Sequence, residues 1–451
     1  MIPIVTPKEM AAIDAAATEP VDVLIGRAGW ATARAARRMM GGTYGRVVNV
    51  IAGPGNNGAD GRAAGRFLGR RGVRVRVFGA SECPPALPAA DLVIDAAYGT
   101  GFHGEWRAPR VGRTPVLAVD IPSGVDGLTG EVGRGVLTAD RTLTFAALKP
   151  GLLFGAGRNL AGEVEVADIG LDASSTHAYA VEAADVARWW RPRPPTAHKW
   201  SRAVRVVAGS PGMTGAAHLA SGAAQRAGAG MVALSSPGVD PGAPVEVVRH
   251  RLPAFDWSGA VLADLHRYHS LVIGPGLGRA DYTVESVRAT VVDAQIPAVV
   301  DGDGLFAMAW NPDGAMPLLR RRRDATVLTP HDGEYGLLTG HRPPADRIAA
   351  ARDLAMDTRA VVLLKGPTTV VAAPAGDVRV ITTADARLAT AGTGDVLAGI
   401  LGELLASGMA ALEAAASAAW IHAEAARHGP AVGLVAGDLL TALPHVVARL
   451  G

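Results

Sequence analysis

Two patterns of apolar and polar positions alternate along the whole chain. Short, mostly apolar runs rich in β-branched residues, such as 46–52, 116–120, 204–210 and 361–364, are separated by longer Ala- and Gly-rich segments. The short runs have the length and composition of strands buried on both faces, and the longer segments have the length of helices. This alternation predicts parallel sheets with helices on both faces, and hence an α/β fold with two three-layer α/β/α domains.

The alternation is absent at two places. Residues 8–39 carry helix formers without strand periodicity, which predicts one or two helices broken near Glu19-Pro20. Between 191 and 200, three prolines in four residues prevent regular strand pairing and favour an extended segment. We therefore expect a first domain over 1–190, a Pro-rich linker over 191–200 and a second domain over 201–451.

The composition narrows the class of protein. The chain has 451 residues, enough for two full cores, and its 44 basic residues nearly balance its 42 acidic ones. This balance favours neither nucleic acid nor a membrane surface as a partner. Cys83 is the only cysteine, which excludes an intramolecular disulfide and agrees with a reducing compartment. Since no apolar run is long enough to span a bilayer, we expect a cytoplasmic protein, and we also expect a homo-oligomer.

A Gly-rich segment follows the first predicted strand. Residues 53–61 contain the pair Asn56-Asn57 among five glycines and prolines, and we predict a loop there that leads into a helix ending near residue 71. Strand, Gly-rich turn and helix together are typical of nucleotide-binding βα units. The amide groups of the two asparagines suit a sugar, a phosphate or a hard cation. Either asparagine could instead serve only as a turn residue.

Three further polar residues follow later strands of the first half. Asp95 ends one predicted strand, and Asp120 and Ser123 follow the next. Because the carboxyl ends of parallel strands converge, these side chains and Asn57 could share one site, and oxygen ligands of this kind suit a hard cation. For any one of them alone, a loop cap is the simpler interpretation.

The second half ends its strands in the same way. Asp301 and Asp303 follow one predicted strand, and His331 follows the next. Lys365 lies between an apolar strand and Gly366-Pro367, where a cation and nearby N–H groups suit a phosphate. The alternative for the acids is a turn, and for the histidine a packing role.

The motif Gly392-Thr393-Gly394-Asp395 opens an apolar, helix-forming run near the C-terminus. Glycines at a helix N-terminus leave backbone N–H groups free, which makes an anion site. An acid placed among phosphates indicates a base that takes a proton from the attacking group. The alternative is that Asp395 only caps the helix.

Several motifs of the first half together resemble the NAD(P)H-hydrate epimerase domain, over nearly all of residues 1–185. They lie at 56–61, 99–101, 119–124, 148–151 and 166–170. The resemblance implies a Rossmann-like fold and a potassium ion held by Asn57, Asp95 and Ser123. Asp120 is our candidate acid/base for interconverting the two epimers of the hydrate. The residues implied to contact the hydrated dinucleotide are Asn56, Asn57, Gly58, Ala59, Asp60, Gly99, Thr100, Gly101, Phe102, His103, Gly104, Glu105 and Asp120.

The second half resembles the ribokinase-like ADP/ATP-dependent NAD(P)H-hydrate dehydratases over about residues 196–450. The matching motifs lie at 274–278, 329–334, 365–369 and 391–395. The residues implied to hold the adenine nucleotide are Lys365, Gly366, Pro367, Thr368, Thr369 and Gly394. Those implied to contact the hydrate are Ala217, Gly276, His331 and Asp395. The resemblance further implies ADP as co-substrate, and we expect magnesium to bridge its phosphates.

The chemistry expected of the second half follows from the leaving group. Hydroxide leaves poorly from the 6-position of the hydrated ring, whereas a phosphate ester leaves easily. Asp395 is therefore expected to deprotonate the 6-hydroxyl for phosphorylation, after which elimination of phosphate restores NAD(P)H. The alternative is a small-molecule kinase of the ribokinase superfamily, with a first domain that only binds a ligand.

Overall fold

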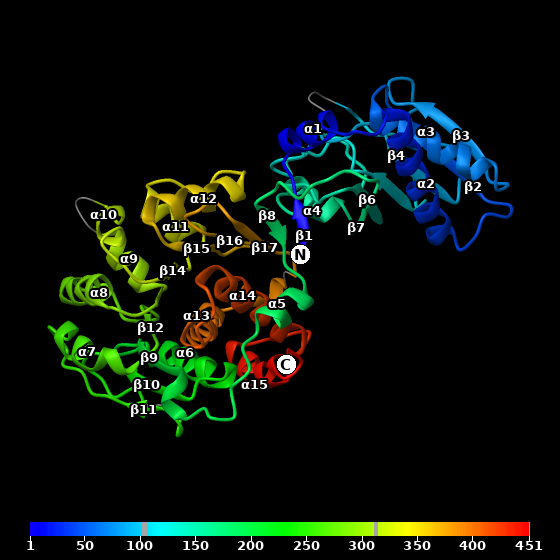
Figure 1. Ribbon diagram of the computed structural model, residues 1–451. Coiled ribbons are helices and arrows are strands. Elements are labelled where there is room, and N and C mark those ends of the chain that lie inside the picture. Colours follow the sequence, from blue (N-terminus) through cyan, green and yellow to red (C-terminus); the bar gives the residue numbers. More distant parts are fainter. Residues whose placement is uncertain (102–105, 243, 311–313, 384, 451) are drawn as a thin grey trace. The chain divides into compact units, whose positions relative to one another are not determined.

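The computed structural model describes residues 1–101, 106–242, 244–310, 314–383 and 385–450, and Figure 1 shows its elements. The chain forms two compact units, one of Ile2–Tyr179 and one of Met1 with Ala180 onward. This division falls before the predicted linker because α5 (Ala183–Trp189) packs within the second unit, where Val186 joins the core beside α14. The Pro-rich stretch has no regular structure before η2 (Lys199–Arg202).

The first unit is built on a parallel sheet with the strand order β3-β2-β4-β5-β6-β7. Helices α2 and α3 pack together on one face of this sheet, and extended segments around Ala80, Trp106 and Leu137 cover the other. The elements are β1 (Ile2–Ile4), α1 (Pro7–Ala15), α2 (Val21–Met40), β2 (Val47–Ala52), α3 (Asn56–Gly69), β3 (Arg74–Gly79), β4 (Leu92–Ala96), β5 (Val116–Val119), β6 (Arg141–Phe145), η1 (Pro150–Leu152), α4 (Gly157–Leu160), β7 (Glu163–Ala167) and β8 (Ala178–Ala180). The α/β class and the two N-terminal helices broken near Pro20 are confirmed.

Helix α3 begins earlier than the sequence predicts. The loop expected over 53–61 ends at Gly55, so the two asparagines lie in the first turn of the helix. Gly58 and Gly61 are packing glycines instead of turn residues. A Cβ on Gly58 would lie 1.9 Å from the carbonyl oxygen of Gly53, and one on Gly61 would lie 2.5 Å from the Cβ of Ala96. Gly58 therefore lets the helix approach the loop that follows β2, and Gly61 lets it approach the sheet.

The second unit contains a mixed sheet. From β17 to β11 the strand order is β17-β16-β15-β14-β13-β12-β9-β10-β11, parallel except where β16 pairs with β15 and β17. Its strands are β9 (Ala203–Val207), β10 (Met231–Ser235), β11 (Val248–Arg249), β12 (Ser270–Ile273), β13 (Ala298–Val300), β14 (Thr326–Leu328), β15 (Val361–Leu364), β16 (Thr369–Ala372) and β17 (Val378–Ile381).

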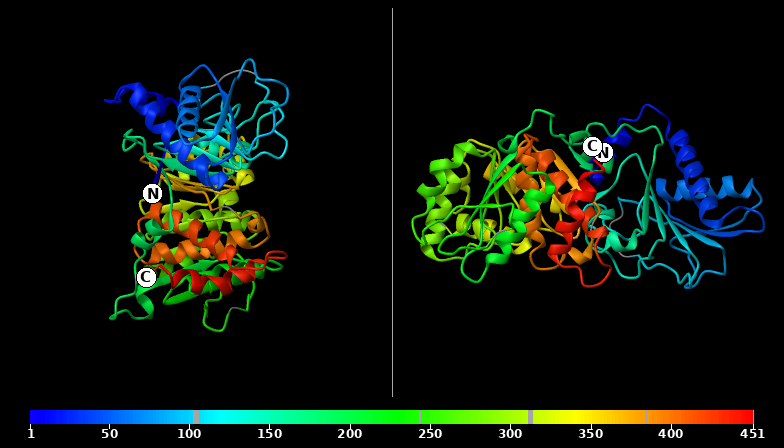
Figure 2. Two further views of the ribbon diagram at one scale, coloured as in Figure 1. Left: turned by 90° about the vertical axis from the view of Figure 1, so that its right-hand side faces the viewer. Right: turned by 90° about the horizontal axis from the view of Figure 1, so that it is seen from below.

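Helices form two groups in this unit. Helices α6, α13, α14 and α15 pack on one another, and α7–α12 form a second set of contacts. In Figures 1 and 2 the green and yellow helices α7–α12 gather apart from the orange and red helices α13–α15. The helices are α6 (Thr214–Ala227), α7 (Ser258–Asp264), η3 (Leu265–Arg267), α8 (Asp281–Asp293), α9 (Asp303–Ala309), α10 (Met316–Leu319), α11 (Asp332–Thr339), α12 (Arg347–Thr358), η4 (Ala386–Leu388), α13 (Thr393–Ala406), α14 (Ala411–Arg427) and α15 (Ala436–Val447). Among the described helices, none combines the length and apolarity that crossing a bilayer requires.

The strand register brings four strand ends of the second unit to one edge. Ile273, the last residue of β12, pairs with Val207 of β9 and Val300 of β13, and Val300 pairs with Leu328 of β14. All four are last residues of their strands, so the residues that follow emerge side by side. The segments that carry the predicted chemistry therefore meet at this edge.

Close packing of α13 against α6 predicts the result of one glycine substitution. A Cβ on Gly399 would lie 2.2 Å from the carbonyl oxygen of Ala220, a backbone atom that cannot rotate away. We expect Gly399→Ala to lower the free energy of unfolding by about 1–3 kcal/mol, despite the gain of about 1 kcal/mol that alanine brings to a helix. Gly437→Ala in α15 is the control, since nothing lies within 4 Å of its Cβ position. Urea unfolding compares the two, and equal stability would contradict the packing.

Candidate functional site

A cavity of about 860 Å³ opens where β2, β4 and β5 of the first unit end. Of the residues predicted to contact a dinucleotide, those that line it are Asn56, Asn57, Asp60, Gly99, Thr100, Gly101 and Asp120. Gly58 and Ala59 belong to the same helix but do not line the cavity. Phe102, His103, Gly104 and Glu105 lie outside the described residues. Strand ends thus bring most of the described set to one place.

Asp120 has a conformation and a partner that a loop cap does not need. Its φ is +67°, in the left-handed region that residues other than glycine, asparagine and aspartate seldom adopt. The Oδ1 atom lies 2.5 Å from Nζ of Lys149 and accepts a hydrogen bond of 3.0 Å from Thr144. Its Oδ2 atom lies 3.7 Å from the Cβ position of Gly99, and that glycine lines the cavity. One oxygen is therefore fixed by donors, and the other lies close to the cavity wall.

Lys149 is a residue whose role sequence reasoning missed. It is 1% exposed, and besides Asp120 its ammonium donates to Thr144 at 2.8 Å and to the carbonyl of Phe145 at 2.9 Å. Three acceptors satisfy its three N–H groups. A buried charge held in this way fixes the carboxylate that it pairs with. The only signal in the sequence was its place in the motif at 148–151.

The three residues predicted to hold potassium differ in their partners. Asp95 is fully buried, and its carboxylate accepts from the Ser123 hydroxyl at 2.6 Å and the Ser123 N–H at 2.9 Å. Burial raises the pKa of Asp95 above its usual range despite these bonds. The buried side-chain oxygen and nitrogen of Asn57 have no hydrogen-bond partner among the described residues. An orphaned amide oxygen and a buried carboxylate are groups that a cation could satisfy.

Two other acids that line this cavity are perturbed. Burial, with repulsion from Asp120 and Asp14, raises the pKa of Asp60 to about 8. Burial also raises the pKa of Asp14, where the attraction of Lys149 works against it. Perturbed carboxyls gathered in one cavity are typical of acid–base sites.

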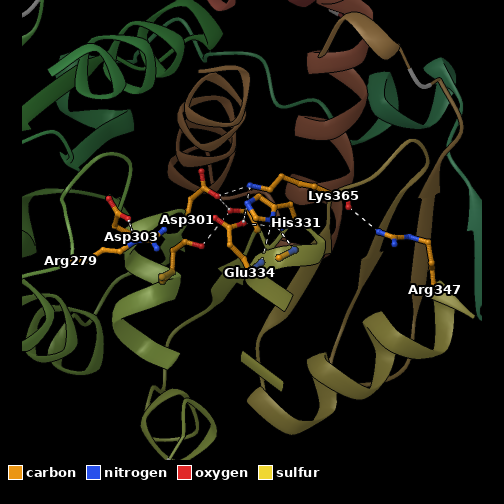
Figure 3. Close-up of polar contacts among 10 residues, drawn as sticks. Arg279, Asp301, Asp303, His331, Glu334, Arg347 and Lys365 are labelled. Carbon is orange, nitrogen blue, oxygen red and sulfur yellow. Dashed lines mark hydrogen bonds and ion pairs between the residues drawn. The ribbon is translucent and has the colours of Figure 1, made fainter. Parts of the chain in front are cut away.

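The strand ends of the second unit carry a cluster of charged side chains, shown in Figure 3. Nζ of Lys365 lies 2.9 Å from Oδ1 of Asp301 and 3.5 Å from Oε2 of Glu334. Thr329 donates to the same Asp301 oxygen at 2.6 Å. Burial lowers the pKa of Lys365, but the two acids outweigh it and the net shift is upward. Lys365 is therefore a cation at neutral pH, beside two carboxylates.

Asp395 lies in the first turn of α13 beside this cluster. The helix starts after Gly392, whose φ of +88° requires glycine, and no side chain caps it. The Cβ position of Gly394 lies 3.7 Å from Nζ of Lys365 and 3.9 Å from Oδ2 of Asp301. Burial raises the pKa of Asp395 to about 7, with Asp301 adding repulsion and Lys365 opposing it. The carboxyl is thus poised to exchange a proton near neutral pH, next to free helix N–H groups.

His331 has a structural role that the sequence did not reveal. It is the N-cap of α11, and its Nδ1 accepts from the N–H groups of Gly333 at 3.0 Å and Glu334 at 3.2 Å. The Glu334 carboxylate in turn accepts a hydrogen bond of 2.9 Å from the backbone N–H of His331. The spacing of three residues between them is the signal of such a capping box. Nε2 of the exposed ring lies 3.6 Å from Oε2 of Glu334 and is the ring atom that a ligand could contact.

The remaining predicted residues of the second unit are placed in different ways. Ala217 is fully buried in α6, so its side chain packs in the core. Gly276 has a φ of +61°, and a Cβ there would lie 2.9 Å from that of Ala216. The loop between β15 and β16 carries the rest, with Gly366 and Pro367 exposed, Thr368 buried and Thr369 half-buried. His218, which the sequence indicated as structural, lies 2.6 Å from the carbonyl of Pro241 through Nε2.

Further polar residues join this site without having been predicted to act there. Asp303 accepts from the Gly278 N–H at 2.9 Å and pairs with Arg279 at 2.8 Å. His422 on α14 is buried, and burial lowers its pKa to about 4, although a bond to the Thr393 backbone opposes the shift. A neutral imidazole therefore packs behind the start of α13.

Fold and sites together define a class of protein: a two-unit α/β enzyme with a carboxyl at the strand ends of each unit, one of them beside an anion-binding helix terminus. Known sequence families cover both units. A family described as NAD(P)H-hydrate dehydratase matches residues 204–446, and the family described as YjeF-related protein N-terminus matches 21–90 and 79–151. The bifunctional NAD(P)H-hydrate repair enzyme Nnr of Mycobacterium leprae is 37% identical over 467 aligned positions, which span 96% of this chain and 95% of its own.

Solved structures agree for the second unit. The ADP/ATP-dependent NAD(P)H-hydrate dehydratase of Bacillus subtilis, co-crystallised with ATP and Mg²⁺, matches with a TM-score of 0.51 and 28% identity, over 60% of this chain and 98% of its own. A ribokinase-like superfamily protein of Enterococcus faecalis, 19% identical, matches with a TM-score of 0.52 over 61% of this chain and 97% of its own, and shows the fold alone. The chain belongs to the bifunctional NAD(P)H-hydrate repair enzymes and is an NAD(P)H-hydrate epimerase and dehydratase.

Proposed function

We propose that Asp120 is the acid/base with which the first unit interconverts the R and S epimers of NAD(P)H hydrate. The observation that carries this proposal is the ion-paired carboxylate beside the cavity. The 6-hydroxyl of the hydrate is part of a carbinolamine, whose configuration is lost when the ring opens or the hydroxyl departs. Ring opening needs a proton acceptor close to the hydroxyl, and departure of the hydroxyl needs a proton donor first and a proton acceptor when water returns, so a carboxyl at this place serves either route. Predicted contacts from Asn56, Gly99 and Thr100 would orient the dinucleotide in the same cavity.

Potassium fits the residues predicted to hold it. Asn57 offers an amide oxygen without a partner, and Asp95 supplies a buried negative charge that no cationic side chain among the described residues neutralises. The Ser123 hydroxyl adjoins that carboxylate. These oxygens would hold the ion, and the bound ion would lower the cost of the buried charge and fix Asn57 at the cavity wall.

For the second unit we propose phosphorylation of the 6-hydroxyl followed by elimination. Asp395 accepts the hydroxyl proton while the oxygen attacks the terminal phosphorus of the nucleotide. The free N–H groups at Gly394 and Asp395 stabilise the charge on the transferring phosphoryl group, and Lys365 lies beside them. The ring nitrogen then expels phosphate, and loss of the C5 proton restores the dihydropyridine. We propose ADP as the co-substrate, which leaves as AMP.

Magnesium fits the same edge. The ion usually takes one or two protein carboxylates together with substrate phosphates, and Asp301 and Glu334 are the carboxylates available beside Lys365. When bound, magnesium would neutralise charge on the nucleotide phosphates.

The raised pKa of Asp395 predicts how dehydration depends on pH. A base works only when it is ionised, so kcat/KM should rise about tenfold per pH unit below pH 7 and level off above it. Asp303 is one of the acids that hold this pKa up, so Asp303→Asn should move the rise to lower pH. Initial rates of absorbance recovery from pH 5 to 9 give both profiles. Profiles that coincide, or show no rise near 7, would contradict the role of Asp395.

One incubation tests the overall function. Purified protein, mixed hydrate epimers, magnesium and either ADP or ATP are combined, and the absorbance of the reduced ring is followed. We expect full recovery of NAD(P)H with release of inorganic phosphate, and faster recovery with ADP. A stable phosphorylated hydrate without recovery would identify a kinase instead.

We also propose a cytoplasmic homo-oligomer, and light scattering of the purified protein measures its mass.

A further inference from the structure

The cavity of the first unit holds more acidic than basic groups. Its charged lining residues, among those described, are Lys149 and four acids, Asp14, Glu19, Asp60 and Asp120. Glu19 pairs with Arg27 at 2.7 Å, and Asp120 pairs with Lys149 at 2.5 Å. Within the described part of the chain, Asp14 and Asp60 have no ion-pair partner. Two carboxyls without a counter-charge therefore face a cavity that is expected to receive an uncharged hydroxyl.

Asp60 is the more buried of these two acids. Only 8% of it is exposed, and neither a hydrogen bond nor an ion pair holds its carboxyl within the described residues. The charged groups that act on it are Asp14 from α1 and Asp120 after β5, and Lys149 pairs with Oδ1 of Asp120. Burial and the repulsion of these two acids favour the neutral carboxyl, which agrees with the pKa of Asp60 of about 8.

We infer that Asp60 is a second catalytic carboxyl of the epimerisation, which donates a proton to the 6-hydroxyl oxygen of the bound hydrate while the Asp120 carboxylate accepts the proton released on its return. The inference rests on the proposed function of the first unit. Asp120 enters as the anion of an ion pair, so it suits the acceptor. Asp60 is the neutral group of the same cavity, so it suits the donor. When their surroundings keep one carboxyl neutral and the other ionised, the neutral group acts as the acid and the ionised group as the base.

The step balances without any further reactant. The proton of Asp60 passes to the hydroxyl oxygen, the C6–O bond breaks with its electron pair leaving on water, and the N1 lone pair forms a C6=N1 double bond. Water then adds to the opposite face of C6, the π pair returns to N1, and Asp120 takes the surplus proton. Transfer of that proton from Asp120 to Asp60 restores the starting state.

The test is the pH profile of kcat for epimerisation, corrected for the spontaneous rate, with chromatographic separation of the epimers. For the unsubstituted enzyme we expect the rate to fall as pH rises through about 8, because Asp60 then loses its proton. Asp60→Asn should lower kcat by about 10²-fold, with a smaller change in KM, and the residual rate should no longer fall near pH 8. Asp14→Asn removes a repelling charge, so the fall should move to lower pH.

Glu131→Gln is the matched control. It removes an acidic charge from the same unit, but the residue is exposed and does not line the cavity, so the profile should not move. If Asp60→Asn keeps the parental kcat and profile while Asp120→Asn is inactive, the inference fails and the proposed function stands. If Asp120→Asn also keeps its rate, the proposed function fails with it. Circular dichroism of each variant verifies that it folds.

Discussion

Asp395→Asn is expected to stop nucleotide-dependent recovery of NAD(P)H, with kcat lower by about 10²–10⁴-fold, while epimerisation continues at the parental rate. The amide has nearly the same shape but cannot take the hydroxyl proton. Stopped-time assays of both reactions on one preparation give the two rates. The two activities separate because Asp120 and Asp395 belong to different units.

Asp438→Asn is a control for the capping alternative. Asp438 is the third residue of α15, as Asp395 is of α13, but it accepts a hydrogen bond of 2.9 Å from the N–H of Val435 and therefore acts as a cap. We expect Asp438→Asn to lose stability and keep activity. Asp395→Asn should instead lose activity and gain stability. Because the pKa of Asp395 is raised to about 7 in the folded protein, from an ordinary value of 3.8, its contribution to stability falls as pH rises from about 4 to 7, and the amide removes that loss. Activity surviving in Asp395→Asn would identify a mere cap.

Asp120→Asn is expected to reduce epimerisation by about 10²–10⁴-fold and to lower the free energy of unfolding by about 3–5 kcal/mol. Asparagine tolerates the left-handed backbone of residue 120, so the strain should not change. The loss of stability comes from Lys149, which is 1% exposed and would lose the counter-ion that compensates its burial. Urea unfolding and the epimer assay measure the two effects.

A double variant separates stability from chemistry. Asp120→Asn with Lys149→Met removes both buried charges, and an apolar chain of similar length fills the space of the lysine. We expect stability to return towards the parental value and epimerisation to remain lost. If the double variant regains the rate, the pair supports the fold and Asp120 takes no part in the reaction.

Most helices and strands could be predicted from the sequence because short stretches of chain determine them. Gly392, followed by helix formers, predicted the start of α13, and the short apolar runs predicted the strands. The prediction of a loop over 53–61 was wrong because Gly58 serves packing against Gly53 and Gly61 serves packing against the sheet, which no local pattern distinguishes from a turn. The domain boundary differed because α5 packs with the second unit through Val186, a contact distant in sequence.

The residues of the candidate sites also fall into those that the sequence predicted and those that it did not. The end of a predicted strand indicated Asp120, and the glycines at the start of a helix indicated Asp395, because both signals are local in sequence. Their partners depend on distant contacts: Lys149 is 29 residues from Asp120, and Lys365 is 64 residues from Asp301. Asp14 precedes any strand of the parallel sheet, so no strand-end argument selects it. His331 was predicted to touch the substrate, but most of its bonding holds the start of α11.

The most direct test of two carboxylate sites acting in series is the extent of recovery from a mixture of R and S hydrates. With ADP, magnesium and the unsubstituted enzyme, we predict that both epimers disappear and all of the reduced cofactor returns. With Asp120→Asn, the rapid phase of NAD(P)H recovery should account for the S epimer alone. Any further recovery should proceed only at the spontaneous rate of epimerisation. Rapid and complete recovery by Asp120→Asn, or early loss of the R epimer, would contradict the account.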